Sequence, residues 1–200
     1  MNRKVGLIGA GIIIAGVITF AVCMLAGPLE LCYGSSIAIA WGLILALCAF
    51  YESAKPDTKT AAMCGVAFGV MYALCNTVVY FIQLTTVKQA ALSAEATSLL
   101  DYRSFGLMFS LDLLGYCLMA LSTFFAGLTV VVKDRGDRAL KVLLLLHGVF
   151  AITCFILPLL GIFTPDLQGA DWIGTAIMEF WCAFFLPIGI LSFRYFKKQT

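Results

Sequence analysis

Charged residues are scarce in this chain. Asp, Glu, Lys and Arg make up 12% of its 200 residues, against 62% hydrophobic residues, whereas a soluble domain usually carries about 25% charged residues. A soluble fold of this length could not bury so many apolar side chains, because apolar runs recur along the whole chain. We therefore expect a single transmembrane domain over residues 1–200, with the lipid bilayer as its main partner.

Motifs of familiar chemistry are also missing. The chain has no Walker loop, no dinucleotide-binding fingerprint, no H-E-x-x-H and no G-x-S-x-G. Its single histidine, His147, excludes a multi-histidine metal site. The net charge of +2 and the lack of a basic patch with interleaved aromatics argue against a nucleic-acid partner. We expect no metal and no cofactor, and the motifs leave any catalytic residue unknown.

Cysteine spacing gives no redox or metal signal. No two of the eight cysteines stand in a C-x-x-C spacing, which many metal and redox sites use. Free thiols packed between helices are the first interpretation. A disulfide between Cys23 and Cys32 is the alternative, since both are expected near the external side.

Hydrophobic runs long enough to cross about 30 Å of hydrocarbon recur six times. The predicted spans are residues 5–27, 34–50, 60–84, 104–132, 140–163 and 172–195. The second is the shortest, so an interfacial or re-entrant segment is the alternative there. The first is interpreted as a retained helix, because its apolar stretch is longer than the core of a signal peptide. The sequence thus predicts an all-α polytopic membrane helix bundle of about six transmembrane helices.

Basic residues set the orientation, since their translocation across the membrane is disfavoured. With the N-terminus inside, eleven of the thirteen Lys and Arg residues fall on the inner side and only Lys88 and Arg103 fall outside. We therefore expect both termini in the cytoplasm. Residues 85–103 then form the longest external connection, in which residues 88–100 are predicted to form a short helix or a solvated linker.

Three ionisable side chains fall inside the predicted spans: Asp112, His147 and Glu179. Such a group costs about 2.5–3.5 kcal/mol at the centre of a membrane helix, so each should face protein or a water-filled cavity. The two acids have no buried Lys or Arg partner and must be protonated, hydrogen-bonded or matched by a cation. Both are placed about two turns below the external surface, where they could meet. His147 is placed in the inner half, as a packing residue or a ligand.

A polar stripe follows the third predicted helix. Steps of three or four residues place six side chains on one face: Gly65, Gly69, Tyr72, Asn76, Tyr80 and Gln83. We predict an external pocket between the third, fourth and sixth helices. Trp41 and Trp181 are interpreted as interfacial anchors or, because they lie deeper, as residues that line this pocket. Its expected ligand-binding residues are Asn76, Tyr80, Gln83, Asp112, Tyr116 and Glu179. The alternative is that these groups satisfy one another, as interhelical hydrogen bonds do at about 0.6 kcal/mol each.

Residues 109–128, FSLDLLGYCLMALSTFFAGL, and residues 80–84, YFIQL, resemble stretches of poorly characterised bacterial multi-pass membrane proteins of unknown function. The resemblance implies a bacterial inner-membrane protein and assigns no activity. The size and helix count are also similar to those of the substrate-binding subunits of vitamin uptake transporters, a similarity of architecture alone.

Three functions are compatible with these features. The first is the binding or transport of a small molecule or ion, cationic if the two acids recognise its charge. The second is an intramembrane enzyme acting on a lipid-like substrate, with a carboxylate as acid or base and His147 assisting. The third is an accessory subunit whose glycine-rich first helix docks a membrane partner. The sequence favours the first, and leaves the ligand and the oligomeric state open.

Overall fold

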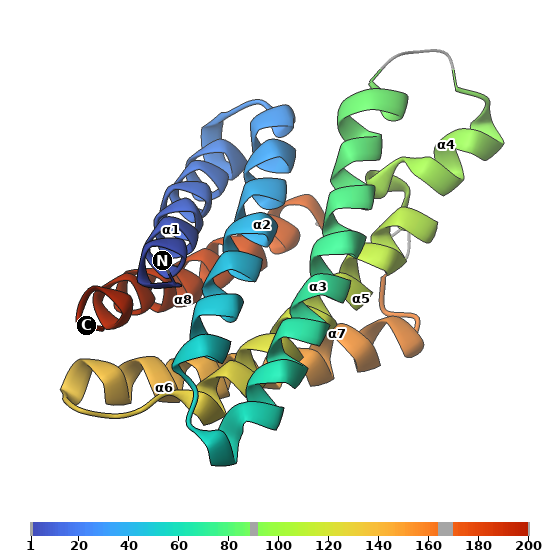
Figure 1. Ribbon diagram of the computed structural model, residues 1–200. Helices are drawn as coiled ribbons and strands as arrows, with labels where there is room; N and C mark the ends of the chain where they lie inside the picture. The colour runs from blue at the N-terminus through green and yellow to red at the C-terminus, as the bar shows by residue number, and fades with distance from the viewer. Residues whose placement is uncertain (1, 89–91, 164–169, 200) are drawn as a thin grey trace.

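The computed structural model describes residues 2–88, 92–163 and 170–199, and all regular structure in these ranges is helical (Figure 1). The helices are α1 (Asn2–Ala26), α2 (Leu29–Ser53), α3 (Lys59–Ile82), α4 (Ala94–Leu100), α5 (Leu107–Thr129), α6 (Arg135–His147), α7 (Val149–Leu159) and α8 (Ala170–Lys197). Three short helical turns join them: η1 (Pro56–Thr58), the π-helical η2 (Gln83–Val87) and η3 (Tyr102–Ser104).

Within the described residues, six helical stretches are long and apolar enough to cross a membrane. They are Asn2–Ala26, Leu29–Ser53, Pro56–Val87, Leu107–Thr129, Arg135–Leu159 and Trp172–Lys197. The predicted all-α bundle of about six spans is thereby confirmed. Large apolar side chains on the outside of the bundle, such as Leu159 at 71% exposure, are those that a membrane protein turns to lipid.

The second span is longer than predicted. α2 begins at Leu29, directly after Pro28, and continues through Gly34, where the predicted run began. A single glycine costs a helix only about 1 kcal/mol, which a helix of 25 residues tolerates. Proline favours a helix start, because its missing N–H is not needed there.

The fifth span is divided into α6 and α7, which meet at Gly148. A Cβ atom at Gly148 would lie 2.9 Å from Cβ of Phe124 on α5. Glycine therefore permits the close approach of α5 to this junction. The start of α6 is capped by Asp134, whose side chain accepts from the backbone N–H of Asp137 (3.0 Å).

The helices pack mainly as antiparallel neighbours. α1 packs against α2 and α8, α3 packs against α2 and α5, and α5 also contacts α6 and α7 (Figure 1). Glycines bring α1 and α2 together, since a Cβ at Gly9 would lie only 2.6 Å from the Gly42 carbonyl oxygen. On the α8 side, a Cβ at Gly6 would lie 2.8 Å from Cγ of Phe196. The buried glycines of α1 therefore face helices of the same chain.

Both termini lie at one end of the bundle, called here the terminal end (Figure 1). Asn2 Nδ2 donates to Glu52 Oε2 (3.3 Å), and Ser53 Oγ donates to Gln199 Oε1 (2.9 Å). The opposite, distal end carries the α1–α2 turn and α4. α4 confirms a short helix within residues 88–100, and its N-cap Ser93 accepts from the N–H of Ala96 (3.2 Å).

Candidate functional site

A buried polar cluster joins α3 to α5 in the distal half of the bundle. The hydroxyl of Tyr80 donates to Asp112 Oδ2 at 3.2 Å and lies 3.5 Å from the hydroxyl of Tyr116. While Tyr80 donates its proton to Asp112, Tyr116 is the donor of the second contact. Asp112 is only 2% exposed. The structure thus brings together three of the six predicted site residues, called here the Tyr80–Asp112–Tyr116 cluster.

Local sequence explains why the cluster forms. Asp112 and Tyr116 are four residues apart on α5 and therefore share a face. Gly115 lies between them, and a Cβ atom there would lie 3.2 Å from Cβ of Cys75 on α3. Gly65 on α3 is equally close to α5, because a Cβ atom at this position would lie 3.2 Å from the carbonyl oxygen of Ser122. Small residues draw the two helices together and leave the larger polar side chains to meet across the interface.

Two groups at this interface carry unpaired polar atoms. Within the described residues, Asp112 Oδ1 and both amide atoms of Asn76 are buried without a hydrogen-bond partner. Asn76 is one turn from Tyr80 on α3 and only 1% exposed. A buried polar group without a partner costs about 1–3 kcal/mol. The Asp112 carboxylate can take up a proton, and its Oδ1 and the Asn76 Oδ1 can coordinate a small cation, which would remove that cost.

Gln83 is buried at the distal end of α3, where it is held by the chain itself. Its Nε2 donates to the carbonyl oxygen of Leu100 (2.9 Å), and its Oε1 accepts from the N–H of Tyr102 (3.1 Å). Both bonds reach across the connection that follows α4. Gln83 therefore fastens this segment over the distal end, a role that its place in the stripe did not indicate.

Glu179 lies apart from the cluster. No hydrogen bond or ion pair joins it to Asp112 in the described part of the chain, so the expected meeting of the two acids is not found. The residue of α8 that faces the cluster is Trp181, whose ring centroid is 5.9 Å from that of Tyr116. Residues two apart on a helix point to different sides. Glu179 is instead near Cys32 and Cys182, with its buried Oε1 lacking a hydrogen-bond partner among the described residues.

His147 is a fully bonded packing residue. Its Nε2 accepts from Trp181 Nε1 (3.2 Å), and its Nδ1 lies 2.8 Å from Thr123 Oγ1. Because the indole nitrogen can only donate, the proton of the neutral imidazole is on Nδ1 and is donated to Thr123. Trp181 is buried in the core, whereas Trp41 is 57% exposed and donates to Thr77 Oγ1 (3.2 Å). Trp41 therefore does not line the cluster.

A cavity of about 270 Å³ lies at the distal end, above the cluster. It is lined by polar and charged side chains that include Glu30, Tyr33, Gln83, Lys88, Asp101 and Arg103. Of the six predicted site residues, this cavity contains Gln83 alone. The ring of Tyr33 stacks on that of Tyr80, with centroids 5.4 Å apart. The predicted pocket is thus a packed helix interface, and Tyr33 lines the distal cavity while stacking on Tyr80 of the cluster.

Ion pairs hold the rim of the distal cavity. Arg103 Nη2 donates to Asp101 Oδ2 (2.9 Å), and Lys88 Nζ lies 3.2 Å from Glu30 Oε1. The hydrogen bond from Arg103 lowers the pKa of Asp101 below its ordinary value. Asp101 is therefore ionised and paired at neutral pH.

Searches against protein-family models, curated proteins and solved structures find no match for this chain. In the described residues, no group of three or more His, Cys, Asp or Glu side chains is placed to hold a metal ion. Cys23 and Cys32 are free thiols, in agreement with the first interpretation of the cysteines. The site therefore has to be interpreted from its own geometry.

Proposed function

We propose that the protein binds a small cation, Na⁺ or a proton, at Asp112 and transports it through the bundle. One observation supports this function above the others. Asp112 is buried at lipid depth with one carboxylate oxygen unpaired, and no basic side chain pairs with it in the described chain. A buried carboxylate without a fixed counter-charge must bind a proton or a cation.

Asn76 supplies the second ligand group in this proposal. Its buried amide oxygen lies on the same helix interface and has no hydrogen-bond partner among the described residues. Amide, hydroxyl and carboxylate oxygens are the ligands that hard cations prefer. The tight packing of α3 on α5 favours a single small ion over a larger molecule.

The proposed route begins at the distal cavity. Tyr33 lines this cavity and stacks on Tyr80, so in this proposal movement of the Tyr33 ring opens a path from the cavity to the Tyr80–Asp112–Tyr116 cluster. Glu30 and Asp101 at the rim are each paired with one basic residue, Lys88 and Arg103, so the opening has no net positive charge that would repel a cation. This arrangement supports a ligand that arrives from the distal side.

In this proposal the terminal end faces the cytoplasm of a bacterial cell, and the distal cavity opens to the outside. The distribution of Lys and Arg along the sequence supports this orientation, because only Lys88 and Arg103 fall at the distal side. Labelling of single cysteines introduced at Lys88 and at Lys55 with a membrane-impermeant maleimide tests it. Only the cysteine at position 88 should react in intact cells.

The geometry gives less support to the two alternative functions, an intramembrane enzyme and an accessory subunit. An enzyme that uses His147 would need one free imidazole nitrogen, but both are engaged by Thr123 and Trp181. An accessory subunit that docks through the glycines of α1 would need their face open. Gly6 and Gly9 are instead covered by α8 and α2 of the same chain.

The function can be tested by ion-dependent stability and flux. Purified protein is titrated with NaCl at constant ionic strength, balanced with choline chloride, and its unfolding temperature is followed. A ligand at a hundred times its Kd stabilises the native state by about 2.7 kcal/mol. The wild type should be stabilised by Na⁺ or by protons, and its proteoliposomes should take up the same ion.

Asp112→Asn should abolish both effects while the protein still folds, since the amide oxygen can still accept from Tyr80. Glu179→Gln is the matched control, because it removes a half-buried acid away from the cluster and should leave both effects unchanged. Unaltered stabilisation and uptake in Asp112→Asn would refute the proposal.

A further inference from the structure

A second cavity, of about 370 Å³, lies at the terminal end of the bundle. Its lining comes from both ends of the chain, from the end of α2 and from the turn between α5 and α6. Arg3, Glu52, Lys133, Asp137, Tyr195 and Lys198 are the residues that decide its chemistry. It lies far from the distal cavity along the bundle and shares none of its residues.

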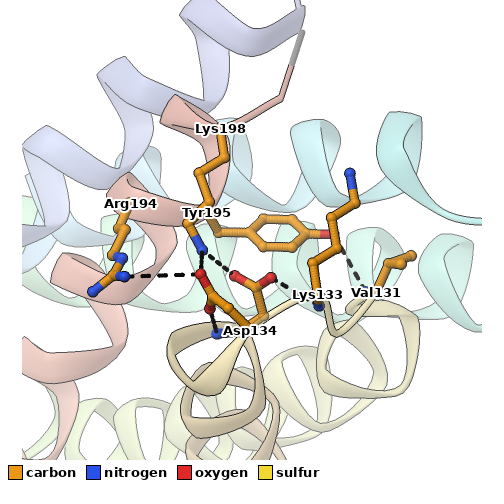
Figure 2. A network of polar contacts seen from close by, with 7 residues as sticks. Val131, Lys133, Asp134, Arg194, Tyr195 and Lys198 are labelled. Carbon is orange, nitrogen blue, oxygen red and sulfur yellow. Dashed lines mark hydrogen bonds and ion pairs between the residues drawn. The ribbon is translucent and has the colours of Figure 1, made fainter.

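Asp137 in this cavity and Asp134 beside it are paired with basic side chains of the protein itself (Figure 2). Lys198 Nζ donates to Asp134 Oδ2 and to Asp137 Oδ1, both at 2.6 Å, and the backbone N–H of Lys133 donates to Asp137 Oδ2 at 3.0 Å. Arg194 adds a longer contact to Asp134, at 3.8 Å. The positive charge of Lys198 is therefore balanced by Asp134 and Asp137 and is not available to a ligand.

Two basic side chains of the lining have no acidic partner within the described ranges. Arg3 and Lys133 line the cavity, and neither side chain forms an ion pair within the described ranges. Figure 2 shows the Lys133 side chain running away from the carboxylates and past the ring of Tyr195. Glu52, the one remaining acid of the lining, accepts from Asn2. The cavity therefore has two basic side chains without an ion pair, Arg3 and Lys133, against one such acid, Glu52, and keeps an excess of positive charge.

The surroundings of the cavity point to a lipid as the source of that anion. The cavity lies where α1, α2, α5 and α8 end, which is the level of the headgroups for a helix that spans a bilayer. Val132, the chain neighbour of Lys133, is 41% exposed, so an apolar side chain that can contact lipid lies beside the cavity lining. Basic clusters at the ends of membrane helices bind anionic headgroups in this way.

We propose that this cavity binds the phosphate of an anionic phospholipid, with Arg3 and Lys133 as its two cationic ligands. Arg3 offers a planar fork of donors that matches two phosphate oxygens, and Lys133 adds a point charge. The acyl chains then lie along the apolar surface beyond Val132. The site is independent of Asp112 and of the proposed ion binding there.

Native mass spectrometry of protein from nanodiscs that contain phosphatidylcholine and phosphatidylglycerol tests this site. The wild type should retain one phosphatidylglycerol molecule. The double variant Arg3→Gln and Lys133→Gln should bind it roughly 30-fold more weakly, because each basic residue contributes about 1 kcal/mol at such a surface. Lys55→Gln with Arg138→Gln is the matched control, since it removes the same charges from exposed positions outside the cavity.

Three results would overturn the proposal. Equal loss of the lipid in the control pair would show attraction by overall charge without a site. Retention in the Arg3 and Lys133 variant would exclude these ligands. Stabilisation of detergent-purified protein by inorganic phosphate, with no added effect of phosphatidylglycerol, would assign the cavity to the free ion instead of the lipid.

Discussion

The hydroxyl of Tyr80 and the carboxylate of Asp112 meet at 3.2 Å between α3 and α5. This is the hydrogen bond that the described chain gives to the Asp112 carboxylate, since Oδ1 has no partner there. Each residue has a further polar residue one turn away on its own helix, Asn76 beside Tyr80 and Tyr116 beside Asp112. One bond therefore fixes the relative position of the polar groups on two spans.

Tyr80→Phe should destabilise the protein by about 1–3 kcal/mol, because it leaves the buried carboxylate with neither oxygen bonded. Tyr116→Phe is the control and should cost less, since its hydroxyl is 3.5 Å from that of Tyr80 and forms no hydrogen bond with Asp112 in the described chain. Titration with SDS, followed by far-ultraviolet circular dichroism, measures both. Equal costs for the two variants would contradict the dominant role of the Tyr80 bond.

His147→Phe should also destabilise by about 1–3 kcal/mol, because it leaves the buried indole N–H of Trp181 without its acceptor. Ion binding at Asp112 should not change. The double variant with Trp181→Phe should be less destabilised than the sum of the two single variants, since both remove the same hydrogen bond. Strict additivity would show that the bond contributes nothing to stability.

Gly9→Ala and Gly11→Ala form a matched pair on α1. A Cβ at position 9 would lie 2.6 Å from the Gly42 carbonyl oxygen, whereas position 11 has no heavy atom within 4 Å. Gly9→Ala should therefore separate α1 from α2 and lower stability by about 1–3 kcal/mol. Gly11→Ala should be neutral or stabilising by up to about 1 kcal/mol. The SDS titration distinguishes them, and a cost at position 11 equal to that at position 9 would refute the assigned packing.

Lys198→Gln should weaken the terminal end in a pH-dependent way. The hydrogen bond from Lys198 lowers the pKa of Asp134 from 3.8 to about 2. The stabilisation by this ion pair is thus complete above about pH 5 and is lost as the pH falls through 2. The stability difference between wild type and variant should be constant at neutral pH and shrink on acidification.

Lys197→Gln serves as the control for the pH experiment, since Lys197 is exposed and has no ion pair in the described chain. Its stability should follow the wild type at every pH. A difference between Lys198→Gln and wild type that is unchanged at pH 2 would show that Asp134 is not the partner concerned.

The spans were predictable because a bilayer demands long apolar segments, whatever the packing of the bundle. Their exact ends were less so. Glycine often ends a helix, yet α2 continues through Gly34, whereas Gly148 separates α6 from α7. Tertiary contact does not decide this either, because Gly9 lies as close to a neighbouring helix as Gly148 does, yet α1 continues through it.

Half of the predicted site could be derived from spacing. Asp112 and Tyr116 share a face of one helix, and Tyr80 lies on the polar stripe of its neighbour, so their meeting follows from helical periodicity. Glu179 could not be placed in the same way, because α8 is apolar around most of its circumference and spacing does not fix its rotation. The contact of Trp181 with Tyr116 sets that rotation and turns Glu179 away.

The ion pairs of Lys198 with Asp134 and Asp137 could hardly be predicted from the sequence. Asp134 and Asp137 have the three-residue spacing of a helix start, but their partner is 61 and 64 residues away. A contact over that distance depends on the terminal ends of α6 and α8 lying together, which hydropathy does not reveal.

The packing of α1 against α8 bears on how the protein is made. α1 is synthesised before α8, so the face of α1 around Gly6 that packs against Phe196 stays uncovered by α8 until that helix has inserted. Closure of the bundle on this side therefore waits for α8. A chain stalled before α8 would carry an open seam on its first helix, which membrane quality control could recognise.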